Sequence, residues 1–85
     1  MELKYDAESD AAYIKVSDGR TARTHEESDV CILDLDAAGN LVGIELLSVF
    51  GFAGASLHAL SRKGLITPAT GESLLRELRR ELIPA

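Results

Sequence analysis

Five side chains in the first half of the chain carry groups that could do chemistry: Tyr5, Asp6, Asp10, Tyr13 and Glu45. Glu45 lies between Ile44 and Leu46 in an apolar stretch, where burial would raise the pKa of a carboxyl and suit it to act as a general base. A cross-strand ion pair with Lys15 or simple exposure is the more common outcome for such a residue. No His or nucleophile lies near Glu45 in the sequence, so no residue is assigned a catalytic role.

The two aspartates and two tyrosines of this set also have a purely structural interpretation. Asp6 and Asp10 bound a stretch of turn-forming residues, and aspartate side chains close turns by accepting backbone N–H groups. Tyr5 and Tyr13 suit the edge of a core, with the ring packed and the hydroxyl in water. We expect the structural role, and keep these four residues with Glu45 as the candidate functional surface.

Metal and cofactor sites are not predicted. Four residues fall at positions 1, 3, 6 and 12 of a calcium-loop pattern: Asp34, Asp36, Gly39 and Glu45. Position 5 is Ala38, which offers no side-chain oxygen, and both flanks are expected to be strands where the motif requires helices. The histidines His25 and His58 lack ligand spacing. The segment is therefore expected to be a plain hairpin turn.

Charge divides the chain unevenly. Residues 1–55 carry four Lys/Arg against eleven Asp/Glu, a net charge of −7, whereas residues 56–85 carry five against three, a net charge of +2. An acidic half repels phosphate backbones, so nucleic acid is an improbable partner except through the tail. The complementary halves could dock within one chain or between two copies, and a basic protein is a possible partner.

Cysteine content and hydropathy predict a soluble, cytoplasmic protein. The single cysteine, Cys31, lies in an apolar run where a buried thiol is expected, so no disulfide can form within the chain. There is no basic leader followed by an apolar core, and no apolar stretch reaches the roughly 18 residues that span a bilayer.

Residues 1–49 have the patterning of four or five short antiparallel strands. Alternation over residues 2–5 and 12–16 predicts a first hairpin. Residues 20–27 are polar and suit an edge strand, residues 30–35 are apolar and suit a central one, and residues 41–49 form the closing strand. Gly43 weakens this last strand unless it marks a bulge or the close approach of another group.

The remaining residues predict two helices. Residues 50–55 are expected to be a Gly-rich joint, after which Ser56 caps a helix that runs to about Lys63 and stops at Gly64. Thr67 and Pro68 start a second helix, with an apolar stripe and a proline stop: Leu75, Leu78, Leu82 and Pro84. The chain is thus expected to be one α+β domain over residues 1–85, a β-meander followed by two helices that pack on the sheet or on a second subunit.

Three strings in the first half resemble one small prokaryotic family. They are Tyr-Asp-Ala-Glu-Ser-Asp-Ala-Ala-Tyr-Ile at residues 5–14, residues 30–36, and Gly-Asn-Leu-Val-Gly-Ile-Glu-Leu-Leu at residues 39–47. The chain resembles the family known as domain of unknown function 2283 over roughly its first fifty residues. That resemblance implies a small sheet domain without an assigned activity. The family often has Pro where this chain has Ala7, and the helical tail lies outside the resemblance.

Three functions remain open. The first is a non-enzymatic protein-interaction module that forms a homodimer. A small sheet and the apolar stripe of a helix are stable only when they pack against another surface, which a second subunit can supply. Small acidic proteins of this kind can act as antitoxins, which is an analogy only. The alternative is a DNA-binding regulator whose second helix presents Arg76, Arg79 and Arg80 to phosphates or bases. An enzyme that uses Glu45 is third.

Overall fold

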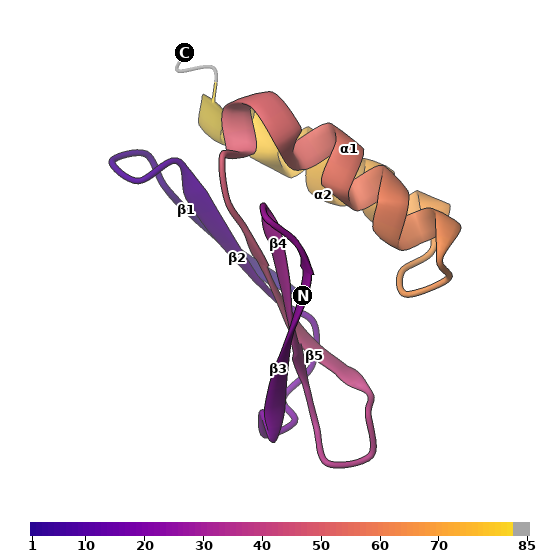
Figure 1. Ribbon diagram of the computed structural model, residues 1–85. Coiled ribbons are helices and arrows are strands. Elements are labelled where there is room, and N and C mark those ends of the chain that lie inside the picture. The colour runs from indigo at the N-terminus through magenta and orange to yellow at the C-terminus, as the bar shows by residue number, and fades with distance from the viewer. Residues whose placement is uncertain (83–85) are drawn as a thin grey trace.

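The computed structural model, which describes residues 1–82, has a single antiparallel sheet followed by a pair of helices (Figure 1). This confirms the predicted α+β arrangement. The elements are β1 (Glu2–Asp6), β2 (Ala11–Lys15), β3 (Arg23–Ser28), β4 (Cys31–Leu35), β5 (Leu41–Leu46), α1 (Val49–Arg62) and α2 (Pro68–Leu82).

The strand order is β1-β2-β5-β4-β3, which is not the order of a meander. β5 occupies the centre and pairs with both β2 and β4, while β4, expected to be central, lies between β5 and the edge strand β3. The chain reaches β3 by running past the end of β5: the N–H groups of Val16 and Ser17 donate to Val42, and that of Ala22 donates to Leu35. β5 suits the central position because four of its six residues are buried, whereas β3 is polar throughout and suits an edge.

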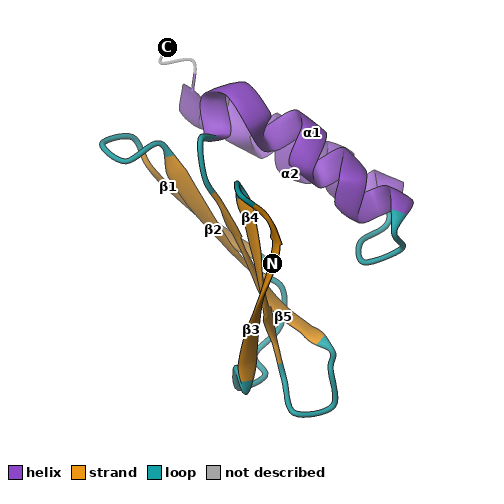
Figure 2. Cartoon of the chain, in the orientation of Figure 1, coloured by secondary structure: helices purple, strands orange, loops and turns teal. Residues whose placement is uncertain are grey.

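Both helices lie on one face of the sheet (Figure 2). The hydrophobic core fills the space between the sheet and the helices. Strand residues that point to the helices share rows across the sheet, such as Leu3, Ile14, Ile44 and Leu33, which the strand registers place side by side. The largest fully buried side chains are Ile14, Ile44, Leu46, Leu57, Leu60, Leu78, Val49 and Cys31. One apolar layer therefore holds sheet and helices together.

The prediction of a Gly-rich joint over residues 50–55 is wrong, because these residues form the first part of α1. The closing strand stops at Leu46 instead of Val49, and Ser56 is a buried mid-helix residue instead of a cap. The physical reason is a stripe at helical spacing that packs on the core: Val49, Ala53, Ser56, Leu57 and Leu60. Burial of this stripe outweighs the weak helix propensity of the two glycines.

The turn between the helices agrees with its sequence signals. Gly64 has a φ of 76°, its N–H donates to Ser61, and the N–H of Leu65 donates to Leu60, which closes the end of α1. Thr67 caps α2 by accepting the N–H of Thr70 at 3.1 Å. The expected stripe of α2 is buried or partly buried, and Leu74 joins it. The predicted stop at Pro84 lies outside the described residues.

The end of α1 is also tied to the edge of the sheet. The Lys63 ammonium pairs with Glu27 on β3, and His25 lies 3.3 Å from the other oxygen of the same carboxylate. The side chain of Glu27 is only 12% exposed, so this pairing satisfies a largely buried carboxylate. Over residues 1–82, neither helix combines the length and the apolar character needed to cross a membrane.

Candidate functional site

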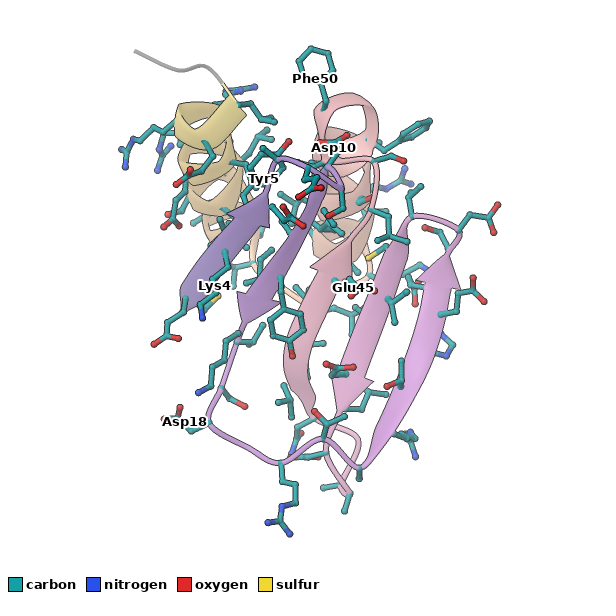
Figure 3. All side chains as sticks on the ribbon, turned by 90° about the vertical axis from the view of Figure 1, so that its left-hand side faces the viewer. Lys4, Tyr5, Asp10, Asp18, Glu45 and Phe50 are labelled. Carbon is teal, nitrogen blue, oxygen red and sulfur yellow. The ribbon has the colours of Figure 1, made fainter. Side chains whose placement is uncertain are left out.

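The face of the sheet that looks away from the helices is uncovered, and Figure 3 views the molecule from this side, with Lys4 and Glu45 in front of the strands. We call it the open face. Two cross-strand rows run over it from β1 to β3, as the strand registers show: Lys4, Tyr13, Glu45, Ile32 and Glu26 in one, and Glu2, Lys15, Gly43, Asp34 and Thr24 in the other. Every strand thus contributes one residue to each row.

Tyr13 bridges three strands across this face. Its hydroxyl donates to Asp34 on β4 at 2.7 Å, and the other oxygen of that carboxylate accepts the hydroxyl of Thr24 on β3 at 3.1 Å. To reach β4 the ring passes directly over Gly43 on β5, where a Cβ would overlap the Tyr13 hydroxyl. The sequence predicts that Gly43 marks a bulge or the close approach of another group, and the structure shows both: the ring of Tyr13 lies over it, and the pairing of β5 with β4 shifts register next to it, from Asp34–Gly43 to Leu35–Leu41.

This hydrogen bond further stabilises the protonated form of Tyr13. Donation to Asp34 raises the pKa of the Tyr13 hydroxyl to about 12, helped by partial burial and by the negative charges of Asp34 and Glu45. Tyr13 therefore keeps its proton at neutral pH and acts as a hydrogen-bond donor. It is not poised as a general base.

Glu45 is exposed and lies opposite Tyr13 in the strand register. The cross-strand pair between Glu45 and Lys15 does not form, because the Lys15 ammonium lies 3.3 Å from Asp18 in the following turn. An open hollow of about 260 Å³ borders Glu45 and is lined by Lys4, Tyr5, Asp6, Ser9, Ala11, Ala12, Tyr13 and Glu45. The structure thus gathers four of the five candidate residues around one hollow and leaves Asp10 outside its lining.

Asp6 closes the turn that follows β1. Its carboxylate accepts the N–H of Glu8 at 3.1 Å and the hydroxyl of Ser9 at 2.7 Å. Both bonds lie within four residues of sequence, which is the pattern by which aspartates stabilise turns. The expected structural role accounts for Asp6.

Asp10 and Tyr5 form a second structural unit, at the top of Figure 3 beside Phe50. The Tyr5 hydroxyl donates to Asp10 at 2.7 Å, which raises the pKa of Tyr5. The same carboxylate accepts the N–H of Phe50, and the Asp10 carbonyl accepts the N–H of Val49. Asp10 therefore caps α1 from a distant turn, a contact that separation along the chain hid from sequence reasoning.

The aspartates of the calcium-like pattern serve the fold separately. Asp34 accepts hydroxyls on the open face, whereas Asp36 accepts the N–H groups of Ala38 at 3.0 Å and Asn40 at 2.8 Å in the hairpin turn. These bonds, chiefly that from Asn40, lower the pKa of Asp36. Within residues 1–82 no three His, Cys, Asp or Glu side chains are grouped so as to hold a metal ion.

The arginines of the tail lie on α2, away from its buried side. Arg76, Arg79 and Arg80 are exposed, while Leu74 and Leu78 face the core. Glu72, Glu77 and Glu81 on the same helix are exposed as well. The two helices run side by side as a hairpin (Figures 1 and 2), whereas a helix-turn-helix reader crosses its helices at roughly 90–120°.

Comparison with known families agrees with the strand half of this structure. A family model described as "Protein of unknown function (DUF2283)" matches residues 2–49, more than half of the chain. The chain belongs to the DUF2283 family. Neither the curated proteins nor the solved structures contain a significant match. The DUF2283 segment includes all five strands and Asp10, and it ends at the first residue of α1.

Proposed function

We propose that this DUF2283 protein is a non-enzymatic protein-interaction module, which forms a homodimer and binds a basic protein on part of its open face. The observation that carries the proposal is the charge of that face. Its two rows hold four carboxylates and two ammonium groups, with both lysines on β1 and β2. In these rows, the residues of β3, β4 and β5 include no Lys, Arg or His. They include three carboxylates: Glu26, Asp34 and Glu45.

This acidic half of the open face suits basic side chains. Ile32 lies between Glu45 and Glu26 in the same row, and the ring of Tyr13 lies next to Glu45. Lys and Arg side chains place their apolar stems on such surfaces while their charged ends meet carboxylates, and Arg also stacks on aromatic rings. An acidic inhibitor of a basic toxin would use a surface of this kind, which is the antitoxin-like form of the proposal.

The arrangement of the polar groups favours binding over catalysis. The hydroxyl of Tyr13 and both oxygens of Asp34 are engaged with one another and with Thr24, instead of pointing at a reacting atom. Glu45 is exposed, and the two histidines lie elsewhere, His25 beside Glu27 and His58 on α1. Ser9 donates to the Asp6 carboxylate on the same hollow, but both residues are exposed and this bond closes the turn after β1, so it does not indicate an activated nucleophile.

Binding of DNA by the tail is the second candidate, because Arg76, Arg79 and Arg80 share the exposed side of α2. The proposal predicts that fluorescently labelled duplex DNA is not retained at low salt. Salt-dependent binding that is lost in an Arg76→Ala, Arg80→Ala variant would favour the DNA-binding regulator instead.

The experiment that tests the proposal compares two charge-matched variants in affinity capture from the native cells. Glu26→Gln with Glu45→Gln removes two charges from the acidic half, and Glu77→Gln with Glu81→Gln removes two from the exposed side of α2. Asp34 is left unchanged because it holds Tyr13. A basic protein retained in stoichiometric amount by wild type and by the α2 variant, but not by the open-face variant, is the expected result. Equal retention by both variants contradicts it.

A further inference from the structure

The outward side of α1 is an uncharged, apolar surface. Between Val49 and Ser61 the helix has no Asp, Glu, Lys or Arg, although 27% of the chain is charged. Phe50 is 81% exposed and Phe52 is 53% exposed. A large aromatic ring left in water at a helix surface is costly, and such surfaces mark contacts with other proteins.

A hollow lies further along the same helix pair, between α1 and α2. Its volume is about 160 Å³, and it is lined by Gly54, Leu57, His58, Ser61, Pro68, Gly71, Glu72 and Leu75. A cavity of about 150 Å³ with apolar walls accommodates benzene, so this hollow has the size of one phenyl ring. Two of its lining residues, Gly54 and Gly71, have no side chains.

Phe50, Gly54, His58 and Ser61 follow one another at spacings of four, four and three residues, so they share one side of α1. Gly54 lies midway between Phe50 and His58. If two copies of α1 pack antiparallel about a two-fold axis at Gly54, Phe50 of each copy lies opposite His58 of the other. The exposed ring and the hollow then coincide.

We propose that two copies of this chain form a symmetric dimer through antiparallel α1 helices, with Phe50 of each copy in the α1–α2 hollow of the other. The proposal deepens the homodimer of the proposed function and rests on it. Three features agree in one register: the exposed ring, the hollow of matching size, and the glycine at the midpoint, which also lines the hollow. A Cβ built on Gly54 would have no neighbour within 4 Å in the single chain, so the helix backbones can approach closely there.

Charge also supports a second copy as the occupant. In a two-fold contact the same surface patch of each copy meets the other, so a patch that carries charges of one sign would repel its equivalent. Between Val49 and Ser61 the α1 surface has no Asp, Glu, Lys or Arg, and His58 is its one titratable side chain. Because one helix of 14 residues offers a small contact area, the dimer is expected to be weak and to dissociate on dilution.

Analytical ultracentrifugation of the full chain tests the proposal, with Phe50→Ser as the disrupting variant and Phe52→Ser as its matched control. Wild type should pass from monomer to dimer over the micromolar range. Phe50→Ser should raise the dimer Kd about 100-fold or more, since two rings are lost per dimer, while Phe52→Ser changes it by less than about 10-fold. The cap on α1 survives both changes, because Asp10 binds the backbone N–H of Phe50. Circular dichroism verifies that the variants fold.

A second variant tests the register. Gly54→Cys places a thiol at the two-fold axis, so mild oxidation should link two copies, whereas Ala69→Cys at an exposed position of α2 should not; Cys31 is buried and does not interfere. A wild type that stays monomeric, a dimer unaffected by Phe50→Ser, or equal cross-linking of both cysteine variants overturns the proposal. Capture of a basic partner by monomeric Phe50→Ser would show that the open face works without the dimer, so the two proposals fail separately.

Discussion

The carboxylate of Asp10 accepts the backbone N–H of Phe50, with 3.2 Å between the Phe50 nitrogen and each carboxylate oxygen. The Asp10 carbonyl also accepts the N–H of Val49 at 3.0 Å, so the turn between β1 and β2 satisfies two donors at the start of α1. Ser48, which precedes the helix, makes no side-chain cap. The negative charge lies at the positive end of the helix dipole, which adds to the stabilisation. A residue of the family segment thus supports a helix that continues beyond it.

Two replacements of Asp10 should distinguish the energetic contribution of the cap from that of the left-handed backbone conformation. Asp10 has a φ of 52°, a conformation that glycine adopts freely and alanine does not. We expect Asp10→Gly to lower the free energy of unfolding by about 1–2 kcal/mol through loss of the cap. Asp10→Ala should cost about 1 kcal/mol more because of the left-handed backbone. Urea unfolding followed by circular dichroism measures both.

Asp6→Ala is the matched control for the cap. Among residues 1–82, the Asp6 carboxylate accepts bonds only from Glu8 and Ser9, in the same turn, and Asp6 is exposed. Its loss should cost less than Asp10→Gly, because no helix depends on it. An equal loss of stability in the two variants would contradict the assignment of Asp10 as the cap of α1.

The contact between Tyr13 and Gly43 predicts strong non-additivity. Gly43→Ala places a Cβ where the Tyr13 hydroxyl lies, so it should displace the ring, break the bond to Asp34 and cost about 1–3 kcal/mol. In a Tyr13→Ala background the three atoms nearest to the new Cβ are gone, so the same change should be neutral or stabilising, since Ala suits a strand better than Gly. A double-mutant cycle by urea unfolding measures the coupling, and additive effects would show that the ring does not lie over Gly43.

Titration of the two tyrosines checks the hydrogen bonds to aspartate. The chain has two Tyr and no Trp, so ultraviolet absorbance follows both phenolates without overlap. In Tyr5→Phe the remaining Tyr13 should ionise near pH 12, and in Tyr13→Phe the remaining Tyr5 should ionise above its ordinary value of 10. The protein unfolded in urea, in which both should ionise near 10, is the control.

The sign of the linkage follows from these shifts. The folded-state pKa of Tyr13 lies above its unfolded value, so the stability contributed by its hydrogen bond is fully present below pH 10 and is lost as the pH rises towards 12. Tyr13→Phe should therefore lose less stability than wild type between these pH values. Parallel losses in the two proteins would argue against the bond to Asp34.

Local signals in the sequence were sufficient for most of the elements. Alternation identified the inward faces of β2 and β5, the polar residues 20–27 identified an edge, and Gly64 with Thr67 identified the turn between the helices. These features depend on neighbours in sequence, where side-chain period and turn chemistry act. The role of Gly43 could also be predicted from the sequence, because glycine inside a strand is unfavourable unless a bulge or a close neighbour requires it.

Features that depend on distant residues escaped prediction. The insertion of β5 between β2 and β4 is decided by which strand buries most, and no local pattern specifies a pairing partner. The start of α1 at Val49 was not predicted, because two glycines and two phenylalanines in residues 50–54 obscure the helical spacing of its buried residues. These residues become recognisable as one stripe only when the helix packs on the core. Of the candidate site, Tyr13 and Glu45 were found, but Asp34 and Thr24 became partners only through the sheet.

Glycine replacements in and after α1 test where the helix begins. Gly51 lies in the first turns of α1 with open space around it, so Gly51→Ala should raise the free energy of unfolding by about 0.5–1 kcal/mol through higher helix propensity. Gly64→Ala is the same chemical change at a φ of 76° and should instead cost about 1 kcal/mol. Both are best measured by urea unfolding in the Phe50→Ser background, where dimer formation does not contribute. If residues 50–55 were a flexible joint, Gly51→Ala would have no such effect, and the opposite signs of the two variants would not be observed.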